Sequence, residues 1–291
     1  MPVRAGSKSY AVANVAYVCQ WFGTLLLVAL LIASSAAQAG VFIAVPESMM
    51  PTMKRIASQA SRKTGIELRA RAGEESALIA EVSRGELPFA IVCRTLSDTE
   101  RSAVEAHLIG YDGVALIVNG RNPVENLETD QITEIYAQRI TRWKSVGGAD
   151  KQIVPIMKEA QTLPISAAGS LLPSLKTPDS GAHVVNADLP AILFVAVDPY
   201  AVGYVGIAEA TRLISEGARI KVITIGGKAP VPEHLRSGAY PYSWPVYLVT
   251  SHITNRRLTE ADQRMKTFLL GPEGKRAWAD AGVAPARGDK P

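Results

Sequence analysis

Short apolar or alternating runs recur along the chain, separated by stretches of mixed character. Runs of this length are typical of buried or half-buried strands. They occur at 41–45, 66–70, 89–93, 114–118, 153–157, 201–205, 220–225 and 244–250. Apolar residues at helical spacing predict helices at 50–62 and 76–84, a helix capped by Thr259 that runs to Leu270, and a last helix ending at Gly282. Strands that alternate with helices predict an α/β fold, with helices on both faces of a mostly parallel sheet.

The stretch 110–148 joins one strand to one helix through a sharp break. The apolar run 114–118 is followed by Asn-Gly and Asn-Pro dipeptides at 119–123, which favour turns. Thr129 can cap the next helix, and the glycine pair 147–148 ends the segment. We therefore expect the chain to cross from one lobe to another here.

Residues 1–39 have the order of a secretory signal. Arg4 and Lys8 are the charged residues of this segment, an apolar run follows at 21–33, and a small-x-small site lies at 37–39. The apolar run is shorter than the roughly 20 residues that a spanning helix needs. We expect cleavage after the site and export to the periplasm; the alternative is a retained anchor.

The composition is that of a globular protein and excludes several classes of function. The formal net charge is +4 without Lys or Arg runs, so no nucleic-acid partner is expected. Of the two cysteines, Cys19 lies in the leader, so Cys93 alone would remain in the mature chain. Four widely spaced histidines form no metal-ligand motif: His107, His183, His234 and His252. No nucleophile, phosphate-loop or dinucleotide motif occurs, so we expect neither an enzyme nor a cofactor.

The ordered pattern of the 110–148 stretch resembles phosphate-type periplasmic solute-binding proteins. The matching positions are Leu127, Thr129, Gln131, Ile132, Ile135, Tyr136, Ile140, Trp143, Val146, Gly147 and Gly148. Segments 201–205, 240–246 and 268–274 also resemble that family. The resemblance implies a two-lobed type II clamshell, with lobe 1 at 41–115 and 245–291 and lobe 2 at 116–244. The runs 114–118 and 246–250 would be the two crossings between the lobes.

Helix starts beyond the carboxyl ends of strands present unpaired N–H groups to a common crevice, which suits an oxyanion. Three junctions qualify: 47–48, 73–76 and 158–164. The resemblance implies that matching loops, with an arginine after the third strand, hold phosphate. Carried over to this chain, the ligand-binding residues would be Ser48, Glu75, Ser76, Arg94, Lys158 and Thr162.

The chain departs from the family pattern at these loops. Glu74-Glu75-Ser76 stands where the family has Gly-Ser-Gly, Leu163-Pro164 replaces a Gly-Thr pair, and the family's proton-accepting aspartate falls near Pro88. A carboxylate close to a bound anion costs about 1–4 kcal/mol. We therefore expect weakened or lost tight phosphate binding, with Arg94 either attracting an anion or pairing with Glu75.

The sequence thus predicts an exported, monomeric solute-binding protein of the phosphate-uptake type. It would close over a small oxyanion, phosphate or similar, and deliver it to a membrane ABC permease. The alternative is a degenerate clamshell that serves as a sensory or interaction module without tight phosphate binding.

Overall fold

The computed structural model describes residues 40–159, 182–252 and 257–286. The expected leader, Thr162 and most of the loop expected at 159–182 lie outside the described residues. The strands are β1 (Val41–Val45), β2 (Leu68–Ala72), β3 (Phe89–Val92), β4 (Val104–Asn119), β5 (Asn126–Leu127), β6 (Val154–Lys158), β7 (His183–Val185), β8 (Ala201–Gly206), β9 (Ile220–Val222), β10 (Thr224–Ile225), β11 (Ser243–Ser251) and β12 (Ala284–Pro285).

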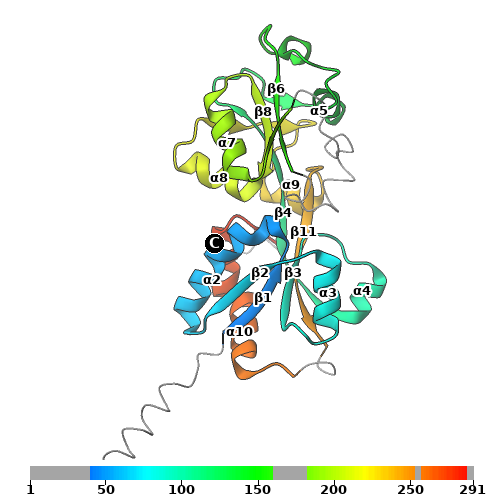
Figure 1. Cartoon of the computed structure of the whole chain (residues 1–291), viewed down its shortest axis with the longest axis vertical. Helices are drawn as coiled ribbons and strands as arrows, with labels where there is room; N and C mark the ends of the chain where they lie inside the picture. The colour runs from blue at the N-terminus through cyan, green and yellow to red at the C-terminus, as the bar shows by residue number, and fades with distance from the viewer. Residues whose placement is uncertain (1–39, 160–181, 253–256, 287–291) are drawn as a thin grey trace, which may run out of the picture. The chain divides into compact units, whose positions relative to one another are not determined.

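Along the chain, helices alternate with these strands, and in space they pack beside the sheet (Figure 1). They are α2 (Met50–Thr64), α3 (Glu75–Ser83), α4 (Asp98–Ala103), α5 (Thr129–Tyr136), α7 (Asp188–Val197), α8 (Ile207–Ser215), α9 (Pro232–Ser237), α10 (Glu260–Leu270) and α11 (Pro272–Asp280), with 3-10 turns η1 (Glu47–Met49) and η2 (Trp143–Val146). No described helix combines the length and the hydrophobicity required to cross a membrane.

The strands β2, β1 and β3 form a parallel group that joins β11 and then β4 in antiparallel pairing. Side chains of β1 alternate between the two faces of this group. Ile43 packs in the same cluster as Ile56 of α2 and Met265 of α10. Ala44 packs in a second cluster with Leu78 of α3. Helices therefore cover both faces, as the fully apolar runs of β1 and β3 predict.

A second group of strands continues the same sheet in the order β4, β8, β6 and β7. Strands β6, β7 and β8 run parallel to one another, and β4 pairs antiparallel with β8 and β9. Helix α7 packs on β4, β6 and β8, while α8 packs on β4, β8 and β9. Each group thus has a parallel core, and the antiparallel strands β4 and β11 make the whole sheet mixed.

Strand β4 belongs to both groups and changes partner near its middle. Residues 104–113 pair with β11, and residues 114–119 pair with β8 and β9. A Cβ on Gly113 would lie 2.4 Å from the Tyr242 carbonyl oxygen, so glycine permits this close crossing. The two expected crossings do lie in paired strands, but β4 is far longer than 114–118. The lobe boundaries stay a prediction.

Several other boundaries differ from those expected. Glu128, not Thr129, is the N-cap of α5, and its backbone N–H donates to Gln131 at 2.9 Å. The run 220–225 forms two short strands that pair with different partners, β9 with β4 and β10 with β5. The helices α4, α7, α8 and α9 were not predicted from the sequence.

Candidate functional site

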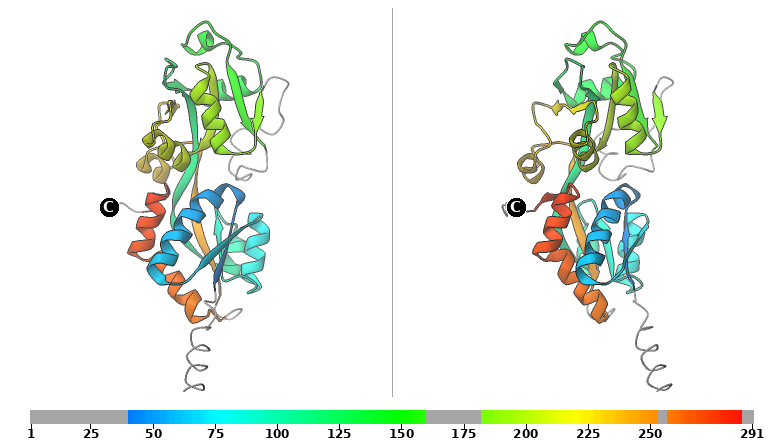
Figure 2. Two further views of the ribbon diagram at one scale, coloured as in Figure 1. Left: turned by 60° about the vertical axis from the view of Figure 1, so that its left-hand side comes forward. Right: turned by 90° about the vertical axis from the view of Figure 1, so that its left-hand side faces the viewer.

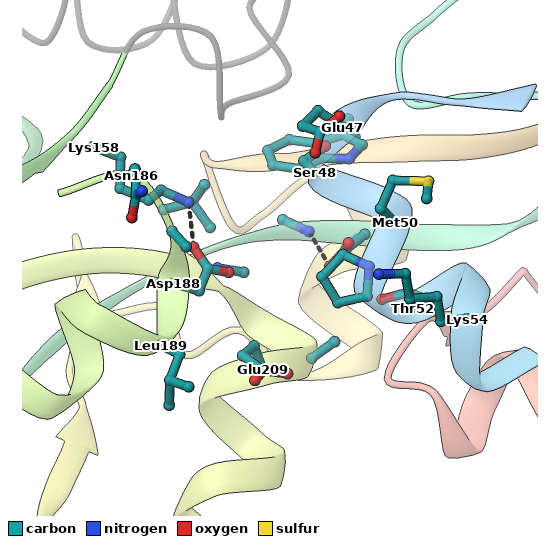
Figure 3. A pocket seen from close by; sticks show the side chains of 18 residues that line it. Glu47, Ser48, Met50, Thr52, Lys54, Lys158, Asn186, Asp188, Leu189 and Glu209 are labelled. Carbon is teal, nitrogen blue, oxygen red and sulfur yellow. Dashed lines mark hydrogen bonds and ion pairs between the residues drawn. The ribbon is translucent and has the colours of Figure 1, made fainter. Parts of the chain in front are cut away.

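One pocket, here called the central pocket, lies where both strand groups meet β4. Its cavity volume is about 280 Å³. Figure 3 shows Ser48 and Met50 on one side, with Lys158, Asp188 and Leu189 on the other. The remaining lining residues are Glu47, Pro51, Thr52, Lys54, Asp112, Gly113, Val114, Asn186, Ala187, Gly206, Ala208, Glu209 and Trp244.

Two hydrogen-bonding groups of the lining lack hydrogen-bond partners within the described parts of the chain. Ser48 follows β1 at the turn into α2, and its Oγ is buried. Trp244 lies on β11, is 6% exposed, and has a buried indole N–H. Neither group has a hydrogen-bond partner among the described residues. Because a buried donor without a partner costs about 1–3 kcal/mol, both groups favour a ligand that offers acceptor oxygens.

Lys158 ends β6 and brings a buried ammonium group to the pocket. Its Nζ forms an ion pair with Asp188, the first residue of α7, and its side chain is 5% exposed. The other Asp188 oxygen accepts the Gly206 N–H at 2.9 Å. The cation is thus already compensated, and an incoming anion must share it with a resident carboxylate.

Asp112 is the most unusual group of the pocket. It lies in the middle of β4, is 7% exposed, and accepts the Gly113 N–H at 2.7 Å. No ion-pair partner for its carboxyl is found in the described parts of the chain. Burial raises the pKa of Asp112 to about 7, and the charge of Asp188 acts in the same direction. The charges of Lys158 and Arg55 oppose this rise without cancelling it.

The lining carries more acidic than basic groups. Four carboxyl residues line it, at Glu47, Asp112, Asp188 and Glu209, against Lys54 and Lys158. Such a pocket can offer donors to one or two oxygens, but it disfavours a ligand of high negative charge.

Three residues predicted from the sequence lie together but outside the lining of this pocket. Glu75 accepts the Cys93 backbone N–H at 2.5 Å, and its other oxygen lies 3.6 Å from Arg94 Nε. Arg94 also donates to the Ser76 hydroxyl at 3.4 Å and pairs with Glu100. The structure therefore places Ser48 and Lys158 in the pocket and Glu75, Ser76 and Arg94 in a separate polar cluster.

Sequence reasoning missed Asp112 and Trp244. A carboxylate within the mostly apolar stretch that leads into 114–118 was the available signal, since an acid in a buried strand needs a reason. Trp244 had no such signal. No group of three or more potential metal ligands occurs in the described residues.

The paired crossings and the pocket between two α/β groups define a two-lobed periplasmic-binding-protein fold. Residues 33–268 match the family model described as the PBP superfamily domain, so the chain belongs to this family. The ABC-type phosphate transport receptor from Vibrio cholerae has a similar structure, with a TM-score of 0.68, 23% identity, and coverage of 84% of this chain and 99% of that chain. A putative phosphate ABC transporter substrate-binding protein with bound phosphate from Clostridium perfringens gives a TM-score of 0.66 at 24% identity, covering 85% and 100%.

Sequence relatives agree with the fold. The phosphate-binding protein PstS of Borreliella burgdorferi is 24% identical over 165 residues, which cover 54% of this chain and 58% of the relative. PstS 2 of Streptococcus agalactiae is 30% identical over 109 residues, covering 36% and 37%. These matches thus span between 37% and 58% of the relatives' length. They confirm the resemblance to phosphate-type solute-binding proteins.

Proposed function

We propose that this protein is an exported solute-binding protein that captures a small, phosphate-like oxyanion in the central pocket. The observation that carries the proposal is a pair of buried groups without a hydrogen-bond partner in residues 40–159, 182–252 and 257–286, Ser48 Oγ and Trp244 Nε1, which line the same pocket as Lys158. The names of the relatives and structural neighbours support phosphate as the first ligand to test. The role is binding rather than catalysis.

Each polar group has a part in this proposal. Ser48 and Lys158 donate hydrogen bonds to oxyanion oxygens, and Trp244 adds an N–H donor from the wall. Asp112 accepts a hydrogen bond from a protonated ligand oxygen, or donates one when it carries the proton itself. Phosphate retains a proton near neutral pH, whereas sulfate has none to share, so an unprotonated Asp112 repels sulfate.

Capture involves closure of two lobes about β4 and β11. The proposed lobes are 41–115 with 245–291, and 116–244. The change of pairing partner near residue 113 of β4 supports a hinge at that point. Closure would bring the η1 turn with Ser48 and the end of β6 with Lys158 onto the same ligand.

The setting in the cell completes the proposal. The leader at 1–39 directs export to the periplasm and is cleaved, and the mature monomer delivers its ligand to an ABC permease. The comparisons do not favour the alternative of a sensory module, since the sequence relatives reported above are phosphate-binding proteins.

Binding is expected to be weaker than micromolar. The ion pair of Asp188 with Lys158 must be shared with the ligand, and the other carboxylates of the lining repel it. The cluster around Arg94 supplies no free cation, because that guanidinium is already paired.

Titration calorimetry and thermal shift with phosphate and sulfate test the proposal. Ser48→Ala and Lys158→Met should each weaken phosphate binding by about tenfold or more, which corresponds to one lost charge-assisted hydrogen bond. Ser76→Ala, which removes a serine outside the pocket, and Lys144→Met, which removes an exposed lysine, are the matched controls. Absence of any phosphate binding at millimolar concentration would refute the proposal, and micromolar or tighter affinity would refute the expected weakness.

A further inference from the structure

A second cavity lies against the other side of α8 and is larger than the central pocket. Its volume is about 900 Å³, and we call it the basic groove. It is bounded by α2, α8, α9, α11 and the chain that follows α11; Figure 2 shows α11 in red beside the olive α8 and α9.

The floor of the basic groove is aliphatic. Ile207, Leu235 and Val283 lie there with exposures of 7%, 3% and 1%. Four prolines add rigid apolar surface, and no aromatic side chain belongs to the described lining. A ligand could bury an aliphatic body against this surface, with a gain of roughly 25 cal/mol for each Å² removed from water.

The rim of the groove is strongly cationic. Five lining residues are basic, namely Arg55, Arg212, Arg236, Lys275 and Arg276, and one is acidic, Asp280. Arg212 is occupied, because it donates to both Glu209 and Glu216. Arg236 and Arg276 have no ion-pair partner within the described ranges. The excess of positive charge therefore belongs to the groove itself and attracts an anion.

The groove and the central pocket are separate sites. Among the described lining residues, Ala208 alone belongs to both. Between them lies the ion pair of Arg55 with Glu209, at 3.5 Å, in which Arg55 faces the groove and Glu209 faces the pocket. Arg55 also donates to the Ala281 carbonyl at 3.2 Å, and its buried Nε has no partner among the described residues.

We propose that the basic groove is a second binding site, for a small organic anion that joins an aliphatic body to a phosphate or carboxylate group. The volume falls in the range of small-molecule sites, about 300–1,000 Å³, and greatly exceeds what an inorganic oxyanion would fill. The aliphatic floor takes the body of the ligand. Arg236 and Arg276 hold the acidic group, because a guanidinium can bind two oxygens of a phosphate or carboxylate at once.

Octyl phosphate is the probe, titrated into the full chain by calorimetry. We expect saturable binding with a stoichiometry near one, weakened by salt. The double variant Arg236→Ala/Arg276→Ala should bind at least about tenfold more weakly. The matched control, Arg62→Ala/Arg121→Ala, removes two exposed arginines away from the groove and should leave the affinity unchanged. Circular dichroism checks that all variants are folded.

Further arms separate this site from the central pocket and from other occupants. Lys158→Met should weaken phosphate binding by about tenfold or more but retain octyl phosphate binding, so the two proposals can fail independently. Octyl glucoside, which has the same tail without a charge, should not bind. Unchanged octyl phosphate affinity in the groove double variant, or no binding at all, would overturn the inference. A third result would also overturn it. This is that an acidic peptide or phosphatidylglycerol vesicles bind through Arg236 and Arg276 while octyl phosphate does not bind.

Discussion

Asp112 and Trp244 lie directly opposite each other on the paired strands β4 and β11. Residues opposite each other in an antiparallel pair project to the same face of the sheet. This register therefore brings a buried carboxyl and a buried indole N–H, distant in sequence, to the lining of one pocket. The pairing of the two crossing strands builds this part of the pocket.

Asp112 should make folding stability depend on pH. Burial raises the pKa of this carboxyl from 3.8 to about 7, so the folded state binds the proton more tightly than the unfolded state between these values. The contribution of Asp112 to the free energy of unfolding is therefore largest below pH 4. It is lost as the pH rises from about 4 to about 7. Integrated over that window, the loss is on the order of 2–4 kcal/mol.

Asp112→Asn should remove this dependence, because an amide cannot ionise and can still accept the Gly113 N–H. Urea unfolding at pH 5 and pH 8 measures the effect. The variant should gain stability relative to the wild type at both pH values, and the gain should be clearly larger at pH 8 than at pH 5. Asp150→Asn, at an exposed position, is the control. If the stability difference between wild type and variant were the same at both pH values, the raised pKa of Asp112 would be contradicted.

Glu100 should act in the opposite direction. Arg94 donates to its two oxygens at 2.8 and 2.6 Å, and this interaction is the main cause that lowers the pKa of Glu100 from 4.5 to about 2. The stabilisation is present above pH 4.5 and is lost as the pH falls through 2. Because the group is partly exposed, solvent reduces the contribution to about 1–2 kcal/mol.

Glu100→Gln should therefore flatten the acid limb of the stability profile. Thermal unfolding at pH 6 and pH 3 gives the comparison, with the greater loss of stability expected for the variant at pH 6. Glu134→Gln removes one partner of the exposed pair with Arg139 and should change the profile less. If Glu100→Gln and Glu134→Gln changed the stability profile equally, the ion pair of Arg94 with Glu100 would contribute no more than the exposed pair of Glu134 with Arg139.

The buried pair of Lys158 and Asp188 should show strong coupling. Lys158→Met leaves the Asp188 carboxylate with the Gly206 N–H as its remaining hydrogen-bond partner among the described residues, and should cost about 3–5 kcal/mol. Lys158→Met/Asp188→Leu removes both charges and should recover much of the loss. A double-mutant cycle by denaturant unfolding measures the coupling, and additive losses would show that the pair is not coupled.

The sequence predicted those elements whose signal is local. The runs at 41–45 and 89–93 became β1 and β3, in which every residue except the exposed Phe42 is buried. Thr259 caps α10 with a capping box, as the pattern indicated. Residues 104–113 gave no strand signal, because their burial is mixed and their pairing with β11 reaches across more than a hundred residues.

The candidate site was likewise predictable where its signal is local. Ser48 and Lys158 each follow or end a strand, so the topology alone placed them at one edge of the sheet. Glu75 and Arg94 do meet, as one of the two alternatives expected. The dominant partner of Arg94 is Glu100, whose position depends on the capping box of α4 and could not be read from spacing. Asp112 and Trp244 required the register of two distant strands.

Gly282 and Gly217 offer a matched test of the contact between α8 and the chain that follows α11. Both adopt left-handed backbone angles, φ +96° and +95°. A Cβ on Gly282 would lie 2.3 Å from Ala208 Cβ, whereas nothing lies within 4 Å of a Cβ on Gly217. Gly217→Ala should cost about 1 kcal/mol from backbone strain alone. Gly282→Ala carries the same strain and adds about 1–3 kcal/mol from overpacking.

Denaturant unfolding of the two variants measures the difference. Because the backbone strain is equal, the excess loss in Gly282→Ala reports the packing of α8 against residues 281–283. Ala208→Gly should relieve part of that excess in the Gly282→Ala background, since it removes the methyl group at 2.3 Å from the new Cβ but leaves the Cα of residue 208 at 2.6 Å. The same substitution has no such effect in the Gly217→Ala background. Equal losses in the two alanine variants, or no rescue by Ala208→Gly, would mean that this contact is not closely packed in solution.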